Sequence, residues 1–223
     1  MDGTTRPRIK ICCIASHEDA RTAVGAGADA LGLVSAMPSG PGPIDEAVIA
    51  AIAAGVPPSI ATFLLTSEQS VGRIIAQHRR CATNTIQIVD QLTDGSYAEL
   101  RDALPGIAIV QVIHVTGPES VDEALAIAPN VHALLLDSGN PRLATKELGG
   151  TGRVHDWHLS RQIREAVDVP IFLAGGLGAA NVREAVEMVQ PFGLDLCSGV
   201  RTDGQLDGTK LEGFMAAVRG AGR

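Results

Sequence analysis

The sequence predicts a single (β/α)8 barrel of the TIM type that spans residues 1–223. Eight short strand-like segments alternate strictly with helical segments, which is the order of a parallel α/β fold. Most strand-like segments are near-continuous apolar runs, as expected for strands covered on both faces. The length of 223 residues suits one such domain. The alternative is an open doubly wound sheet, but eight units exceed its usual five or six strands.

The expected strands are short runs rich in apolar and β-branched residues. They are Ile9–Ile14, Ala30–Val34, Ser59–Leu65, Thr85–Val89, Ala108–Val115, Ala133–Asp137, Pro170–Ala174 and Leu194–Ser198. The segments that follow them have helical patterns. These expected helices are Glu18–Gly25, Ile44–Ala54, Ser67–His78, Ser96–Ala103, Ser120–Ala128, Asp156–Ala166, Ala179–Val189 and Lys210–Val218.

Three helix starts carry side-chain oxygens that can accept hydrogen bonds from free backbone amides. They are Ser67 with Ser70, Ser120 with Glu123, and Asp156 directly before Trp157. We expect the indole of Trp157, the only tryptophan, to pack in the core rather than to serve the site.

The composition is that of a globular protein with an aliphatic core. Hydrophobic residues make up 45% of the chain and aromatic residues only 3%, so Ala, Val, Ile and Leu must fill the interior. The net charge of −7 argues against a nucleic-acid or membrane partner. No apolar run approaches the roughly 18 residues that span a bilayer. The segment Met1–Arg8 is polar with no signal-peptide core after it, so we expect a cytoplasmic protein.

The cysteines show no metal or disulfide framework. None of Cys12, Cys13, Cys81 and Cys197 belongs to a C-x-x-C pair, and no histidines stand at metal-ligand spacing. We therefore expect reduced thiols, no metal and no cofactor.

Polar residues at the carboxyl ends of the strands are the first candidates for chemistry, because those ends carry the active face of such barrels. The first strand offers Lys10 and Cys12, and the sixth ends in Asp137. The alternatives for these two residues are a small buried core residue at Cys12 and a helix or loop cap at Asp137. Among the histidines only His114 is expected to face the pocket. The others are expected at the surface or at caps: His17, His78, His132, His155 and His158.

Glycine-rich segments follow the last three strands. Gly149–Gly152 comes after the sixth strand, Gly175-Gly176 after the seventh and Ser198-Gly199 after the eighth. Glycines let backbone amides approach an anion, and the loops after strands seven and eight form the common phosphate site of this fold. A phosphorylated small molecule is therefore the expected ligand.

A set of motifs in a fixed order resembles the phosphoribosylanthranilate isomerase family of tryptophan biosynthesis, part of aromatic amino acid biosynthesis. The motifs are Lys10-Ile11-Cys12, Gly27–Gly32, Leu135–Ser138, Gly149–Gly152, Asp156-Trp157, Leu173–Leu177, Asn181-Val182 and Asp195–Val200. The resemblance implies an Amadori rearrangement of an aminoaldose phosphate to an aminoketose phosphate, without metal or cofactor.

The resemblance also implies roles for particular residues. Cys12 would be the general base and Asp137 the general acid. The phosphate would be bound by Gly175, Gly176, Ser198 and Gly199. Asp195 would hydrogen-bond a sugar hydroxyl. A thiolate base needs a lowered pKa and an acidic carboxyl a raised one, and a partly dry barrel mouth can provide such shifts.

The chain departs from the family pattern where the anthranilate carboxylate would bind. Residues 37–43 contain no Arg or Lys, and Gln87–Asp90 lacks the family's His. Cys13 replaces a Gly, and Arg201 stands where the family has a Glu. We expect Arg201 to face the barrel mouth and partly to replace the missing contact with an acidic substrate group.

Two other functions remain open on this reasoning. One is a paralogous isomerase of another phosphorylated sugar, and the other is a non-catalytic binder of a phosphorylated ligand. A binder has no need of Cys12 and Asp137 at opposed strand ends, which favours catalysis. The sequence leaves open whether the protein is a monomer or a homodimer.

Overall fold

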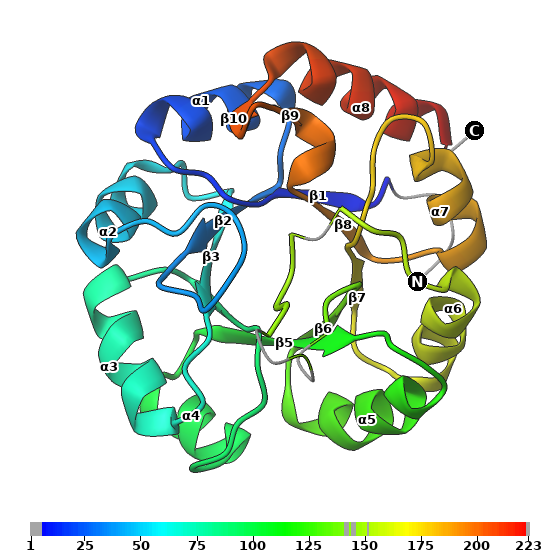
Figure 1. Cartoon of the computed structure of the whole chain (residues 1–223). Coiled ribbons are helices and arrows are strands. Elements are labelled where there is room, and N and C mark those ends of the chain that lie inside the picture. The colour runs from blue at the N-terminus through cyan, green and yellow to red at the C-terminus, as the bar shows by residue number, and fades with distance from the viewer. Residues whose placement is uncertain (1–5, 141–142, 144–145, 151, 222–223) are drawn as a thin grey trace.

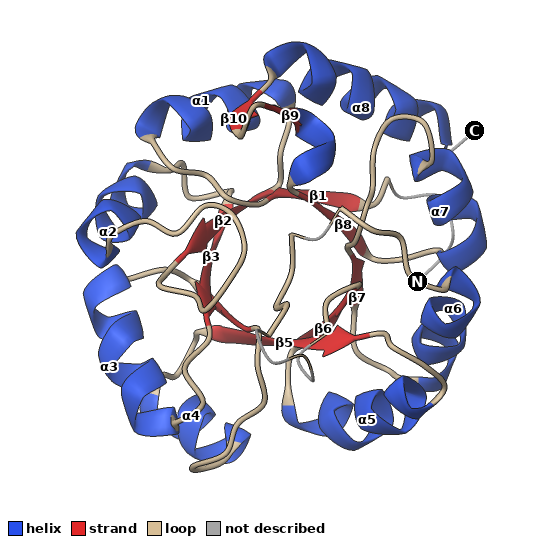
Figure 2. Ribbon diagram, viewed as in Figure 1, coloured by secondary structure: helices blue, strands red, loops and turns tan. Residues whose placement is uncertain are grey.

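Eight parallel strands close into a barrel, and a ring of helices surrounds it in the computed structural model (Figures 1 and 2). The structure describes residues 6–140, 143, 146–150 and 152–221. The barrel strands are β1 (Arg8–Ile11), β2 (Ala30–Val34), β3 (Ala61–Thr66), β4 (Thr85–Ile88), β5 (Ala108–His114), β6 (Ala133–Asp137), β7 (Ile171–Leu173) and β8 (Gly193–Leu196). Strand β1 pairs with both β2 and β8, which closes the barrel and confirms the predicted fold class.

The helices follow the strands in the expected alternation. They are α1 (His17–Ala26), α2 (Glu46–Gly55), α3 (Val71–Cys81), α4 (Tyr97–Ala103), α5 (Glu119–Ile127), α6 (Trp157–Ala166), α7 (Val182–Val189) and α8 (Gly208–Ala221). None of the helices in the described part of the chain is both long and apolar enough to cross a membrane.

Several elements are shorter or shifted relative to the sequence prediction. Strand β1 ends at Ile11 and β8 at Leu196, each before the expected end, so the residues that follow belong to loops of the carboxyl face. Helix α3 begins at Val71, four residues later than expected. A short hairpin of β9 (Arg201–Thr202) and β10 (Gln205–Leu206) between β8 and α8 was not predicted.

Only one of the three proposed caps is confirmed. Asp156 accepts a hydrogen bond from the His158 amide at the start of α6. The proposal for Ser67 with Ser70 is wrong, because the Ser70 side chain makes no capping bond. The proposal for Ser120 is also wrong. Ser120 lies inside α5, where its hydroxyl is buried and donates to the His114 carbonyl oxygen.

Two apolar layers hold the barrel together. The outer layer lies between strands and helices and contains alternate strand residues such as Ile11 and Leu33, together with Trp157. The inner layer fills the barrel with side chains such as Phe63, Leu135 and Phe172. Because successive strand residues point to opposite faces, Lys10 and Cys12 belong to the interior while Ile9 and Ile11 face the helices.

Candidate active site

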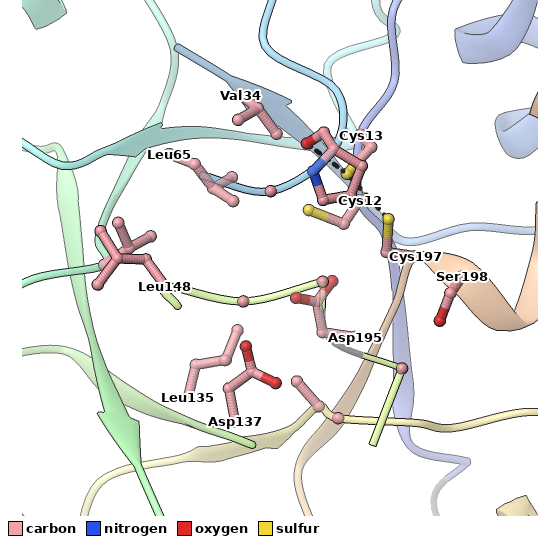
Figure 3. A pocket seen from close by; sticks show the side chains of 18 of the residues that line it. Cys12, Cys13, Val34, Leu65, Leu135, Asp137, Leu148, Asp195, Cys197 and Ser198 are labelled. Carbon is pink, nitrogen blue, oxygen red and sulfur yellow. Dashed lines mark hydrogen bonds between the residues drawn. The ribbon is translucent and has the colours of Figure 1, made fainter. Parts of the chain in front are cut away.

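A pocket that is partly open to solvent lies at the carboxyl ends of the strands. Residues from β1, β2, β3, β4, β6, β7 and β8 or their following loops line it (Figure 3). Cys12, Asp137, Gly175, Gly176, Asp195 and Ser198 are all among them. The structure therefore brings together six of the eight residues proposed from the sequence.

Cys12 is the first residue after β1, and its amide still donates to the Leu196 carbonyl oxygen of β8. Its side chain is 7% exposed. Gly32 on β2 leaves the space for the thiol, because a Cβ at residue 32 would lie only 2.9 Å from Cys12 Sγ. The hydrogen bond to β8 therefore fixes the backbone at Cys12, and the space left by Gly32 lets the thiol reach the pocket.

Asp137 is the last residue of β6 and lies across the pocket from Cys12 (Figure 3). One carboxylate oxygen accepts a hydrogen bond of 2.8 Å from the Ser138 amide. Burial raises the pKa of Asp137 above its usual value, and the Ser138 amide, His114 and Lys10 offset only part of this shift. A carboxyl group with a raised pKa can carry a proton at a pH where an ordinary aspartate cannot, as a general acid requires.

Asp195 on β8 pairs with Lys10 on β1 in the barrel interior. Lys10 Nζ lies 2.8 Å from Asp195 Oδ1, and the two side chains are 0% and 8% exposed. Burial by itself lowers the pKa of Lys10, but the Asp195 carboxylate, together with Cys12 and Cys13, more than offsets this effect, and the net pKa is raised. The ion pair therefore reaches the pocket through Asp195, which is one of its lining residues.

The glycine-rich loops meet at one end of the pocket. Gly175 and Gly176 have φ values of 82° and 62°, a region that side chains rarely adopt. Ser198 is exposed and lies in a 3-10 turn, Ser198–Val200, after β8. Gly199 is not a lining residue. A Cβ there would collide with the Leu177 carbonyl oxygen, so Gly199 instead lets the loops after β7 and β8 touch.

The loop after β6 also reaches the pocket, through Gly149, Gly150 and Gly152. A Cβ on Gly149 would lie 2.8 Å from Asp137 Oδ2. Thr151 of the same motif lies outside the described residues.

Arg201 does not face the pocket as its position in the sequence predicts. It does not line the pocket. Its Nη2 donates to the carbonyl oxygens of Cys12 and Cys13 at 2.9 and 2.6 Å, and its Nη1 donates to Gly204 at 3.0 Å. The guanidinium is thus bound to backbone in the turn after β1, because the hairpin after β8 folds its side chain towards β1.

The histidines also need a correction. His114 lines a neighbouring pocket with Lys146, and its Nε2 lies 2.9 Å from the Val89 carbonyl oxygen. His78 is buried rather than exposed, because its Nε2 lies 2.7 Å from the Thr83 carbonyl oxygen where α3 leads to β4. The His78 ring therefore makes a structural contact between α3 and β4.

Three pocket features were not singled out from the sequence. The loop after β2 covers the pocket through Met37, Ser39 and Pro41, and the Ser39 hydroxyl donates to the Lys146 carbonyl oxygen. Cys13 and Cys197 also line the pocket. The Gly- and Pro-rich composition of residues 38–43 was the available signal for a covering loop. Across the described chain, no group of three or more His, Cys, Asp or Glu residues could hold a metal ion.

The fold and the pocket define an enzyme-type (β/α)8 barrel with an opposed thiol and carboxyl at its carboxyl face. The chain belongs to the N-(5'-phosphoribosyl)anthranilate isomerase family, whose model matches residues 9–217. It is 37% identical over 204 residues to the N-(5'-phosphoribosyl)anthranilate isomerase of Haloarcula marismortui, covering 91% of this chain and 90% of the relative. It is 35% identical to N-(5'-phosphoribosyl)anthranilate isomerase 2 of Methanosarcina mazei, covering 93% and 92%.

Solved structures of the family have the same fold. The phosphoribosyl anthranilate isomerase of Thermotoga maritima superposes with a TM-score of 0.80 at 28% identity, covering 96% of this chain and 99% of that one. Another structure, with a TM-score of 0.77 at 26% identity and the same coverage, is a complex with reduced 1-(o-carboxyphenylamino)-1-deoxyribulose 5-phosphate.

Proposed function

We propose that this chain catalyses the isomerisation of phosphoribosylanthranilate in tryptophan biosynthesis, an aldose–ketose isomerisation. The observation that carries this proposal is the opposed arrangement of Cys12 and Asp137 in one pocket, with the pKa of Asp137 raised by burial. An acid and a base on opposite sides of a sugar are what an Amadori rearrangement requires.

The two ends of the pocket differ in character, which supports this substrate class. Gly175, Gly176 and Ser198 gather at one end, where backbone amides can hold a phosphate. Leu65 and Leu148 lie at the other end (Figure 3), where an apolar wall suits an aromatic ring. A sugar between them would lie beside Cys12 and Asp137.

The reaction begins with two proton transfers and ends with a tautomerisation. Asp137 protonates the ring oxygen of the furanose, the bond from that oxygen to C1 breaks, and the anilino nitrogen supplies the electron pair that forms an iminium. Cys12 removes the proton from C2, and the electrons of that bond form an enolamine. The enolamine tautomerises to the ketone. The two proton transfers use groups that the pocket presents.

One observation favours a different phosphorylated aminosugar as an alternative substrate. Among the described residues, no Lys or Arg lines the pocket, so no cation is available there for the anthranilate carboxylate. Lys146 lies in the adjoining pocket, but its ammonium is 2.5 Å from the Asp90 carboxylate. A paralogous isomerase whose substrate lacks the carboxylate would fit this wall equally well.

The experiment is a direct assay joined to complementation. The purified chain is mixed with phosphoribosylanthranilate, formation of the ketose isomer is followed by chromatography, and the gene is introduced into a tryptophan auxotroph lacking this isomerase. We expect turnover and growth. If the chain shows no turnover and no growth but converts a phosphorylated aminosugar that lacks the carboxylate, the alternative is established. Phosphate binding without turnover of either substrate would indicate a binder.

We also propose that the enzyme acts in the cytoplasm, as a monomer or a homodimer, and without nucleic acid. The biosynthetic role supports the first point, and the net charge of −7 supports the last. Ultracentrifugation of the purified chain distinguishes the two oligomeric states.

A further inference from the structure

Cys13 and Cys197 form a close pair of thiols at the edge of the pocket. Their Sγ atoms lie 2.9 Å apart and share a hydrogen bond, although the residues are 184 positions apart in the chain (Figure 3). Cys13 follows β1 and Cys197 follows β8, so the register of these neighbouring strands creates the pair. A disulfide has an S–S length of about 2.05 Å, so an approach of under ~1 Å would form the bond.

The backbone at Cys13 is strained. Its φ is 61°, in the left-handed region where glycine is favoured and other residues incur about 1–2 kcal/mol. Its Sγ is held from the other side by the Pro41 carbonyl oxygen at 3.5 Å. A thiol thus stands in a strained position, directed at a second thiol.

We propose that Cys13 and Cys197 are a redox modification site, at which a hydroperoxide drives formation of a reversible disulfide between them. This modification needs only the two thiols and an oxidant, so it goes beyond the proposed isomerase activity.

The two thiols have different parts in this reaction. Cys197 is partly exposed, whereas Cys13 is 5% exposed. The hydrogen bond with Cys13 lowers the pKa of Cys197, and the nearby Arg201 guanidinium adds to this effect. Hydrogen bonds with Cys12 and Cys197, together with burial, raise the pKa of Cys13. Cys197 is therefore the thiolate that a peroxide meets first, and Cys13 is the resolving thiol.

The oxidation takes place in two balanced steps. Cys197 Sγ attacks one peroxide oxygen, the O–O bond breaks, and the released hydroxide takes up a proton to leave as water. Cys197 is then a sulfenic acid. Cys13 Sγ attacks that sulfur, the S–O bond breaks, and the second hydroxide leaves as water with the Cys13 proton. Two thiols and one hydrogen peroxide thus yield one disulfide and two waters.

The disulfide would constrain both ends of the proposed site. Cys13 is adjacent to Cys12, and Cys197 is adjacent to Ser198. A bond between the two loops would draw them together where the sugar and phosphate have to enter, so we expect the oxidised form to lose most isomerase activity. This consequence rests on the proposed function, whereas the disulfide itself does not.

The test counts thiols in the full chain. The reduced protein is treated with hydrogen peroxide, denatured, alkylated with N-ethylmaleimide and weighed intact. We expect the four free thiols of the reduced chain to fall to two, a proteolytic peptide that links residues 13 and 197, and recovery of all four thiols with dithiothreitol. Turnover of the same samples should fall and recover in parallel.

Three variants make the test specific. Cys13→Ala should form no bridge and instead trap a dimedone-reactive sulfenic acid on Cys197. Cys197→Ala should form neither. Cys81→Ala removes a buried thiol at the end of α3 and should still form the bridge. Four alkylated thiols after peroxide treatment, or a bridge that includes Cys12, would overturn the proposal, and neither result depends on an active enzyme.

Discussion

Lys10 and Asp195 form an ion pair inside the barrel, with Lys10 Nζ 2.8 Å from Asp195 Oδ1. The pair joins β1 to β8 where the barrel closes, and the ammonium also lies 5.3 Å from the ring centroid of Phe63. Removing one member of a buried pair leaves an uncompensated charge, which usually costs about 3–5 kcal/mol.

We therefore predict that Lys10→Met lowers the free energy of unfolding in urea by about 3–5 kcal/mol. Lys10→Met combined with Asp195→Leu should regain most of that loss, because no charge is left unpaired. Arg161→Ala is the matched control, since Arg161 pairs with Glu165 on the exposed face of α6 and should cost only about 0.3–0.5 kcal/mol. A loss for Lys10→Met as small as this control would contradict the prediction.

Asp137→Asn should make the protein more stable and nearly inactive. Burial raises the pKa of Asp137, so the folded state binds the proton more tightly than the unfolded chain. Wild-type stability therefore falls as pH rises from the unfolded value, about 3.9, through the raised folded value. An asparagine has no such dependence and can keep the hydrogen bond from Ser138.

Two measurements check this prediction. Urea unfolding at several pH values should show the advantage of Asp137→Asn growing with pH across that window. Turnover at neutral pH should fall by about 10²–10⁴-fold, the usual contribution of a positioned acid. In the wild type, kcat/KM should decline as pH rises through the raised pKa of Asp137. A destabilised variant at neutral pH would show that the carboxylate is better solvated than its burial implies.

Cys12→Ser should retain the fold and lose activity. Serine is nearly the same size but is a far weaker base near neutral pH, so we expect turnover to fall by about 10²–10⁴-fold. Cys81→Ser is the control, because Cys81 is buried in α3 away from the pocket. Thermal unfolding and steady-state kinetics should be measured on both. Wild-type turnover by Cys12→Ser would remove the thiol from the mechanism.

Arg201→Ala tests whether this residue supports the backbone or contacts the substrate. Its hydrogen bonds to the carbonyl oxygens of Cys12, Cys13 and Gly204 predict a loss of about 1.5–3 kcal/mol in the free energy of unfolding. Because these bonds position Cys12, turnover should fall equally for phosphoribosylanthranilate and for its aniline analogue without the carboxylate. A loss confined to phosphoribosylanthranilate would instead establish the carboxylate contact expected from the sequence.

Gly199→Ala should weaken phosphate binding. The added methyl group meets the Leu177 carbonyl oxygen, so the loops after β7 and β8 have to separate at the proposed phosphate end. We expect inhibition by inorganic phosphate to weaken by at least about tenfold, which corresponds to 1.4 kcal/mol. Gly178→Ala is the matched control in the same pair of loops, because a Cβ there meets no atom within 4 Å. Equal inhibition of both variants would place the phosphate elsewhere.

Local patterns in the sequence were sufficient for the architecture. The sixth strand was predicted with its observed bounds, Ala133–Asp137, because its run of apolar residues is buried on both faces and ends in a charge. The ends of the strands were predicted less accurately. Residues 12–14 continue the apolar pattern of β1, but the strand ladder itself stops at Ile11.

The tertiary structure decided what the pocket residues contact. Arg201 was expected at the barrel mouth, and only the fold of the hairpin after β8 turns it towards the Cys12 and Cys13 carbonyls. The same holds for Lys10 with Asp195 and for Cys13 with Cys197, which are 185 and 184 residues apart.

The physical reason is the range of the forces involved. Burial preference and backbone propensity act within a few residues, so they can be seen in the sequence. The partners of a hydrogen bond or an ion pair are selected by closure of the barrel, which brings the first strand against the last. The raised pKa of Asp137 likewise depends on which groups surround it in space. The sequence by itself determined the barrel and, through its resemblance to a family, the candidate acid and base, and the packed fold determined their surroundings.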